Sequence, residues 1–187
     1  KGVTMSIKSS IFEVCPIFES ARFQLRLVSL EDSWDLLECY SDQKSAELFN
    51  SDNCTSDFNF SNIKEMHDSI SLWLKEYNEK KYIRFSIFDF LTHKVIGTTE
   101  IFRKDFENKK IGVLRLDLKS EFEKNQYLNE LFQLIDNNFK DIFNYNSLIT
   151  KSVPKATERI KTLTSQNFEE WKKNDIMPSE HYYIKHY

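Results

Sequence analysis

The sequence is poor in the residues that usually mark linkers, cross-links or special backbone turns. It contains 3 glycines, 3 prolines and 3 cysteines among 187 residues. The chain has no low-complexity segment, and its 40% hydrophobic and 29% charged residues are ordinary for a soluble globular protein, so we do not expect disorder. The cysteines, Cys15, Cys39 and Cys54, are odd in number and widely spaced. This pattern argues against a disulfide framework or a zinc site and predicts reduced thiols in a cytoplasmic protein.

Long apolar runs and clustered positive charge are missing as well. No run of about 18 apolar residues exists, so we expect no membrane span. We expect no signal segment, because residues 1–20 lack a charged stretch followed by an apolar one, and we base no prediction of the fold on the four residues before Met5. The net charge is −3 and the lysines and arginines are scattered, which argues against nucleic acid as a partner. The four histidines lack metal-site spacing, since His181 and His186 fall on opposite faces of a predicted strand.

The chain is rich in aromatic residues arranged in amphipathic patterns. Its 187 residues predict one domain, residues 1–187, rather than two small ones, and its 16 Phe and 8 Tyr predict a core of packed rings. Periodicity predicts helices over 30–42, 62–81, 123–143 and 155–163, and strands over 10–18, 22–28, 82–90, 95–104, 111–118, 147–153, 168–175 and 180–187. Short turns make the three strands between 82 and 118 antiparallel neighbours. The order predicts an α/β (α+β) fold: one mixed, mostly antiparallel sheet with helices on both faces.

Two segments carry more local predictions. Asn62 and Glu65 have the spacing of a capping box at the start of the helix over 62–81. The polar stretch 41–61 has loop composition with one helical turn near residues 46–49, and either a lid over a cleft or a plain surface loop fits it.

Four stretches, taken in order, carry a family resemblance: RFQLRLVSLEDSWDLLECYSD, VIGTTEIF, LRLDLKSEFEKNQYLNELFQLI and LTSQNFEEW. From about Phe18 to Tyr187 the chain resembles the GNAT superfamily of acyl-CoA-dependent N-acyltransferases. It looks most like the branch that acetylates ribosomal-protein N-termini and small amines. The resemblance implies a GNAT fold, acetyl-CoA as co-substrate, and a small-molecule amine or a protein N-terminus as acceptor. It also implies direct attack by the amine in a ternary complex.

In that family the central strand binds the pantetheine arm, and a glycine-rich loop holds the pyrophosphate at the next helix N-terminus. The positions that match by order are Leu116, Leu118 and Lys119 on the strand, and Lys124, Asn125, Gln126 and Tyr127 in the loop and first turn. Lys124 and Gln126 stand in place of the two glycines, and Glu123 stands where a basic or amide residue is usual. Glycine is scarce throughout the chain, so its absence from this loop is only weak evidence against coenzyme binding.

Other departures from the family pattern lie on the helix over 155–163. Ala156 and Arg159 replace an Asn-x-x-Ser pair, and Thr162 and Leu163 stand where a tyrosine general acid is common. Three hypotheses follow: an N-acetyltransferase, a GNAT-fold binding module without catalysis, and an acyltransferase for another acyl-CoA with Lys124 on the phosphates. An enzyme predicts an open cleft between residues 114–118 and 148–153. A binding module predicts the cleft filled by Lys124, Gln126 or Arg159.

Two carboxylates are candidates for the base that accepts the amine proton. Glu100 lies on a meander strand, and Asp117 lies on the central strand beside the expected thioester. Strand alternation puts Val113, Arg115 and Asp117 on one face and the intervening leucines on the other. The competing interpretation is that these carboxylates form cross-strand ion pairs with neighbouring arginines.

The remaining aromatic residues have a structural and a functional interpretation. Tyr182, Tyr183 and Tyr187, on the last hairpin, are predicted to pack the sheet or a dimer contact, with an acceptor pocket as the alternative. A homodimer is therefore one expected assembly. Trp34 and Trp73 lie on helical stripes, and we expect both to be in the core or to line a groove.

Overall fold

The computed structural model describes residues 10–49, 58–172, 176–177 and 180–187. One sheet crosses the described part of the chain in the order β1-β2-β3-β4-β5-β6-β8-β7. Neighbouring strands are antiparallel except β5 and β6, which are parallel. The strands are β1 (Phe18–Glu19), β2 (Phe23–Leu27), β3 (Ile83–Asp89), β4 (Lys94–Phe106), β5 (Lys109–Leu118), β6 (Ser147–Lys151), β7 (Glu169–Glu170) and β8 (Tyr182–His186). The mixed, mostly antiparallel sheet predicted from the sequence is confirmed.

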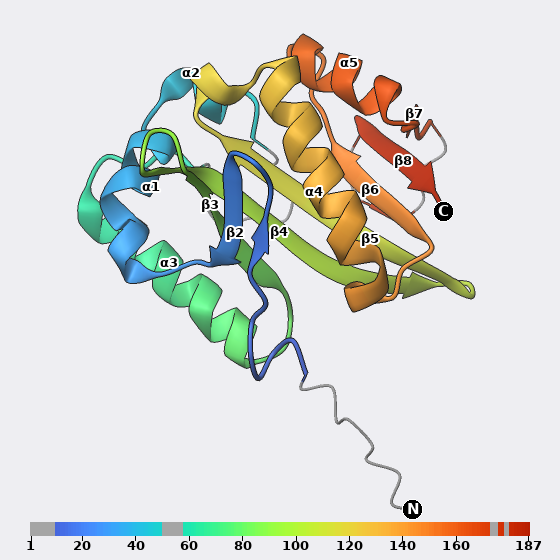
Figure 1. Ribbon diagram of the computed structural model, residues 1–187, viewed down its shortest axis with the longest axis horizontal. Helices are drawn as coiled ribbons and strands as arrows, with labels where there is room; N and C mark the ends of the chain where they lie inside the picture. Colours follow the sequence, from blue (N-terminus) through green and yellow to red (C-terminus); the bar gives the residue numbers. More distant parts are fainter. Residues whose placement is uncertain (1–9, 50–57, 173–175, 178–179) are drawn as a thin grey trace, which may run out of the picture.

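Helices cover both faces of this sheet, as predicted (Figure 1). The helices are η1 (Leu30–Asp32), α1 (Ser33–Tyr40), α2 (Gln43–Ala46), α3 (Ile63–Asn78), η2 (Ser120–Phe122), α4 (Asn125–Phe143) and α5 (Thr157–Ser165). α1 and α3 pack on one face, and α4 and α5 pack on the other. Strand alternation therefore sends successive side chains of β5 to opposite faces of the sheet, with Leu114, Leu116 and Leu118 in the core under α4.

The helix boundaries follow from local chemistry. The Asn62 side chain accepts a hydrogen bond from the Glu65 N–H, and the Glu65 carboxylate accepts one from the Asn62 N–H, so the predicted capping box is confirmed. α4 ends at Asn144, which adopts a left-handed φ of 51° and so terminates the helix. α2 forms at residues 43–46, slightly before the helical turn predicted within the polar stretch; residues 50–57 of that stretch lie outside the described residues.

Two sequence predictions about local structure are wrong. The segment 10–18 forms a turn rather than a strand, with the N–H groups of Glu13 and Val14 both donating to Ser10. Pro16 has no N–H to offer a sheet, so the strand begins only at Phe18. On α1, Trp34 is 68% exposed, because it lies about 240° around the helix from buried Tyr40.

The core is aromatic, as the composition predicts. Phe85 and Phe139 lie at the centre of the layer under α4, with ring centroids 5.4 Å apart, and Phe18 lies 5.5 Å from Phe139. Cys15 and Cys39 are free thiols, and burial raises the pKa of both, that of Cys15 to about 11; Cys54 lies outside the described residues. In the described part of the chain, no helix has the length and apolarity needed to cross a membrane.

Candidate functional site

The two parallel strands at the centre of the sheet separate at one end. β5 pairs with β6 from Ile111, opposite Ser147, to Leu114, opposite Thr150. β5 then continues to Leu118, still paired with β4, whereas β6, which pairs with β8 along its other edge, ends at Lys151. Among the described residues, the end of β5 therefore has a strand neighbour on one side only.

The backbone groups at this end of β5 point in two directions. The N–H of Lys119 donates to a carbonyl of β4 at 2.9 Å. The carbonyl of Asp117 also faces β4, since a Cβ added to Gly97 would lie 2.0 Å from its oxygen. Successive residues direct their backbone groups to opposite edges of a strand. The N–H and C=O groups of Leu116 and Leu118 therefore face the side that β6 has left.

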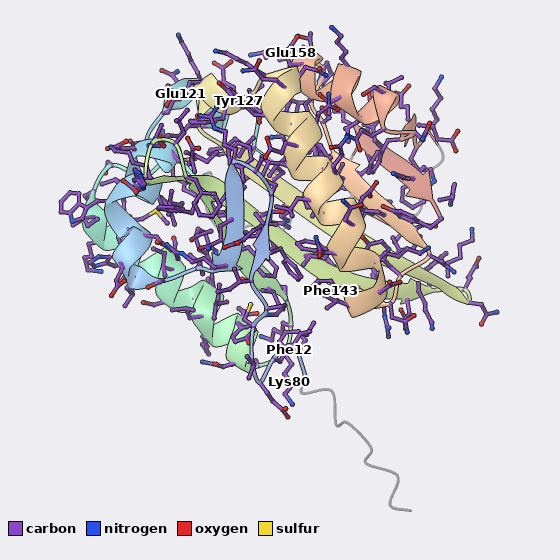
Figure 2. The ribbon with its side chains drawn as sticks, in the orientation of Figure 1. Phe12, Lys80, Glu121, Tyr127, Phe143 and Glu158 are labelled. Atoms are coloured by element: carbon purple, nitrogen blue, oxygen red, sulfur yellow. The ribbon has the colours of Figure 1, made fainter. Side chains whose placement is uncertain are left out.

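The first turn of α4 is already held by α5. Lys124 is the N-cap residue and makes no side-chain cap bond. Instead, the backbone N–H of Asn125 donates to Glu158 Oε2 at 2.9 Å, and Asn125 Nδ2 donates to Thr162 Oγ1 at 2.9 Å. Figure 2 shows Glu158 beside the start of α4. Because the first N–H groups of a helix favour an anion, a carboxylate of the chain itself stands where the sequence predicts pyrophosphate.

A buried ion pair joins the same loop to the same helix. Arg159 is 1% exposed, and its Nε donates to Glu123 Oε2 at 3.2 Å while its Nη2 bonds the other carboxylate oxygen. Glu123 is itself buried. We call the three contacts of α5 with this loop, Glu158 to Asn125, Thr162 to Asn125 and Arg159 to Glu123, the α5 clasp. Of the three residues predicted to fill the cleft in a binding module, Arg159 is the buried one.

The other predicted coenzyme residues have their side chains elsewhere. Lys124 is exposed, and Lys119 Nζ pairs with Glu38 at 2.6 Å. Gln126 is exposed and lines a polar groove between α4 and the turn from β1 to β2. The Tyr127 ring lies under the guanidinium of Arg22, 4.5 Å from its carbon. Backbone contact with a ligand stays a prediction for these residues.

A buried charged network lies on the other face of β5, the one covered by α1 and α3. Arg84, on β3, bonds Glu100 Oε2 at 2.5 Å, and its Nη1 lies 3.4 Å from Asp117 Oδ2. The hydroxyl of Tyr40 donates to the same Asp117 oxygen at 2.9 Å. The guanidinium carbon lies 4.2 Å from the ring centroid of Trp73, which is buried as predicted. The structure thus brings both predicted carboxylates to one arginine.

The two carboxylates differ in how completely they are bound. Glu100 lies opposite Arg84 on β3 and opposite Arg115 on β5, and its Oε1 is 3.4 Å from Arg115 Nε. Asp117 Oδ1 has no hydrogen-bond partner among the described residues. Burial raises the pKa of Asp117 above its usual 3.8, against the opposing effects of Arg84 and Tyr40. Cross-strand ion pairing therefore describes Glu100 well, whereas Asp117 keeps one buried oxygen without a hydrogen-bond partner among the described residues.

Sequence reasoning missed the residues that organise the face of β5 that carries Asp117. Tyr40 lies within the helix predicted over 30–42 and Arg84 within the strand predicted over 82–90, yet both contact Asp117. The available signal was an arginine between two buried apolar residues, Ile83 and Phe85, inside a strand. A cation in such a run needs a carboxylate partner across the strands.

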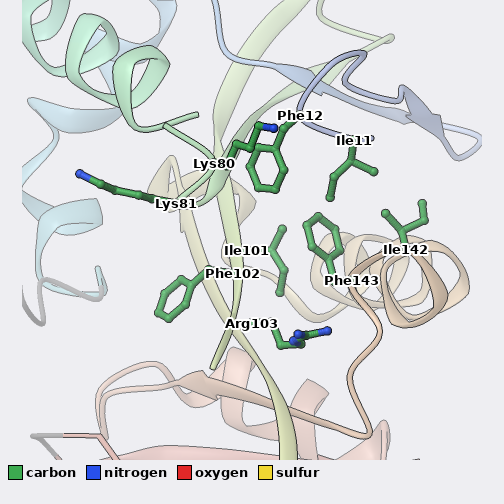
Figure 3. Close-up of a pocket in the computed structure, with 9 residues that line it drawn as sticks. All are labelled: Ile11, Phe12, Lys80, Lys81, Ile101, Phe102, Arg103, Ile142 and Phe143. Carbon is green, nitrogen blue, oxygen red and sulfur yellow. The ribbon is translucent and has the colours of Figure 1, made fainter. Parts of the chain in front are cut away.

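A separate pocket lies at the far end of α4. It has a volume of about 320 Å³ and is formed where residues 11–12, β4 and the C-terminal end of α4 meet (Figure 3). Ile11, Phe12, Ile101 and Phe143 supply apolar lining, with lysines and an arginine at its edge. None of the predicted site residues lines it. Among the described residues, no group of three His, Cys, Asp or Glu side chains is arranged to hold a metal ion.

Comparison with known structures gives extensive matches to acetyltransferases. A GNAT-family acetyltransferase from Bacillus anthracis matches with a TM-score of 0.67 and 12% identity, over 91% of this chain and 98% of that one. A ribosomal L7/L12 α-N-protein acetyltransferase in complex with coenzyme A matches with 0.68 and 10%, over 91% and 98%. The microcin C7 self-immunity acetyltransferase MccE, in complex with acetyl-CoA and AMP, matches with 0.68 and 14%, over 90% and 94%.

These matches show that the chain has the GNAT fold, as the sequence resemblance predicts. No protein-family model and no curated protein sequence matches it. A fold hosts more than one activity, so the function has to be argued from the site.

Proposed function

We propose that the protein is an acyl-CoA-dependent N-acetyltransferase that moves an acetyl group from acetyl-CoA to an amine. The observation that supports this most is the edge of β5 that no described strand pairs, where Leu116 and Leu118 direct backbone groups away from β4. A pantetheine arm is extended and carries amides, so it can pair with such an edge as an added strand would. The GNAT fold shared with coenzyme-bound acetyltransferases supports the same placement.

The proposed reaction forms a bond between the acceptor nitrogen and the acetyl carbon and breaks the carbon–sulfur bond. The nitrogen loses a proton, and the leaving thiolate gains one. We assign the proton transfer to Asp117, directly or through a water, with Oδ1 as the receiving atom. A raised pKa suits a carboxylate for this role, because it binds the proton more tightly than an exposed carboxylate does.

The partners of Asp117 would orient it. Tyr40 and Arg84 hold Oδ2, which leaves Oδ1 in a fixed direction. Glu100 then acts through Arg84 as a positioning residue, since its oxygens are engaged by Arg84 and Arg115. Acceptors fall into two proposed classes, a small-molecule amine or a protein N-terminus. The ribosomal-protein acetyltransferase among the structural neighbours supports the second.

A second candidate is a GNAT-fold binding module that performs no transfer. The α5 clasp favours it, because Glu158 and Glu123 put negative charge where the donor's phosphates would lie. If these contacts persist in the presence of acetyl-CoA, the loop before α4 and the first turn of α4 cannot accept a pyrophosphate. The two candidates make opposite predictions for the same assay.

The test is amine-dependent release of free CoA thiol from acetyl-CoA, across a panel of small amines and short peptides. We expect release with at least one acceptor class, and a loss of about 10²-fold or more in D117N with acetyl-CoA binding retained. D68N, an exposed aspartate on α3, is the matched control and should keep full activity. No release with any acceptor, or a D117N rate equal to wild type, would contradict the proposed enzyme.

A further inference from the structure

The α5 clasp has two features in common with a bound phosphate. A carboxylate oxygen of Glu158 accepts the first N–H of α4, which is the bond a phosphate oxygen makes at a helix N-terminus. A second carboxylate, from Glu123, meets the guanidinium of Arg159 through both its oxygens, as a phosphate meets arginine. Both anionic groups belong to the chain itself.

The clasp draws on one face of α5. Glu158, Arg159 and Thr162 lie within one helical turn and all contact the loop or first turn that precedes the body of α4. Glu158 is exposed, so it can leave the amide of Asn125 for water at little cost. Arg159 is buried, so after Glu123 leaves it would need another anion.

We propose that α5 holds the donor site closed in the free protein, with Glu158 and Glu123 as internal stand-ins for the donor's phosphates. On binding, the donor's pyrophosphate replaces both carboxylates, and Arg159 becomes its cationic partner. This inference rests on the proposed function, since it places acetyl-CoA on this loop. It assigns to Arg159 a contact that the family pattern supplies with a different residue.

The consequence is a binding competition that single substitutions can shift. A ligand that must first open a closed site has an apparent affinity lowered by the fraction of open molecules. Removing a stand-in raises that fraction. E158A and E123Q should each bind acetyl-CoA about tenfold more tightly than wild type. E121Q is the matched control, because Glu121 is an exposed acid on η2, in the same part of the molecule (Figure 2).

The experiment is calorimetric titration of acetyl-CoA into full-length wild type, E158A, E123Q and E121Q. Tighter binding by E158A or E123Q, with E121Q unchanged, supports the proposal, including the case in which wild type shows no binding. If wild type binds and neither variant binds more tightly, the clasp is overturned while the proposed function stands. If none of the four proteins binds acetyl-CoA at millimolar concentration, both are overturned.

A second measurement needs no ligand. In wild type the amide hydrogen of Asn125 is held by Glu158, so its exchange with solvent should be slow. We expect E158A to speed exchange at Asn125 with no change in the strands. Equal exchange in wild type and E158A would overturn the contact on which the proposal depends.

Discussion

The two faces of the sheet beside β5 each contain one fully buried arginine, and their surroundings differ. Arg84, under α1 and α3, meets Glu100 and Asp117, which both project from strands. Arg159, on the buried side of α5, meets Glu123 in a loop. Partners on paired strands cannot move without breaking the sheet, whereas a loop carboxylate can turn toward water. We conclude that the first arginine is a fixed part of the core and the second is a contact that can exchange.

Arg84→Met should cause the largest loss of unfolding free energy, because it removes the arginine whose partners are held on paired strands. It leaves Glu100 and Asp117 buried with less positive charge to offset them. Loss of one partner from a buried ion pair costs about 3–5 kcal/mol. Equilibrium unfolding in urea should show this loss of unfolding free energy. A loss below about 1 kcal/mol would mean that the network tolerates rearrangement, contrary to our account.

Gly97→Ala tests whether the backbone of β4 and β5 beside Asp117 is as rigid as the side-chain network. An added Cβ would lie 2.0 Å from the carbonyl oxygen of Asp117, which belongs to the paired strand and cannot move aside. Overpacking of this kind costs about 1–3 kcal/mol or more. Gly112→Ala is the control, since its nearest neighbour is the Tyr145 ring at 2.6 Å, a side chain that can shift. Gly112→Ala should cost less, and the reverse order in urea unfolding would refute this argument.

Arg159→Met should destabilise the protein less than Arg84→Met does. Its partner Glu123 adjoins exposed Lys124 and can rotate into solvent, so the expected loss is about 1–3 kcal/mol. Adding E123Q to Arg159→Met should restore part of the lost stability, because no uncompensated carboxylate is then left. A loss equal to that of Arg84→Met, with no recovery in the double variant, would remove the difference between the two arginines.

The pH dependence of stability gives the smallest and most specific effect. The folded protein raises the pKa of Asp117, so it binds this proton more tightly than the unfolded chain does. The contribution of Asp117 to unfolding free energy is therefore greatest near or below pH 3.8 and falls as the pH rises through the folded pKa. Each pKa unit corresponds to about 1.4 kcal/mol. The unfolding free energy of wild type minus that of D117N should decrease from pH 4 to pH 7. An increase in this quantity over the same range would contradict the assignment.

Much of the fold could be predicted because periodicity and turn signals agree with the global order. The central meander, the capped α3 and the long α4 all have apolar residues at the spacing of their element. The strand prediction for residues 10–18 was wrong because Pro16 and a local turn outweighed the strand-like composition. The burial predicted for Trp34 was wrong because the sequence of a short helix does not fix which of its faces meets the sheet.

The site was less accessible to sequence reasoning, for a physical reason. Glu100 and Asp117 could be identified as carboxylates on adjacent strands, but their common partner Arg84 depends on the strand register. The α5 clasp depends on how α5 docks against a loop about 30 residues earlier, and no local signal reports that contact. The missing glycines indicated an altered loop. They could not show that the backbone N–H of Asn125 in that loop region donates to Glu158.

In the proposed enzyme, the end of β5 beyond its pairing with β6 and the first turn of α4 together bind an acyl-CoA. The most direct measurement is thermal unfolding of the wild type and of E158A with and without acetyl-CoA, with free CoA as a second ligand. At about 100 times its dissociation constant, a ligand of the folded state adds about 2.7 kcal/mol of stability. We predict an upward shift with both ligands, reached at lower concentration in E158A. The absence of any shift in both proteins at millimolar ligand would contradict the account.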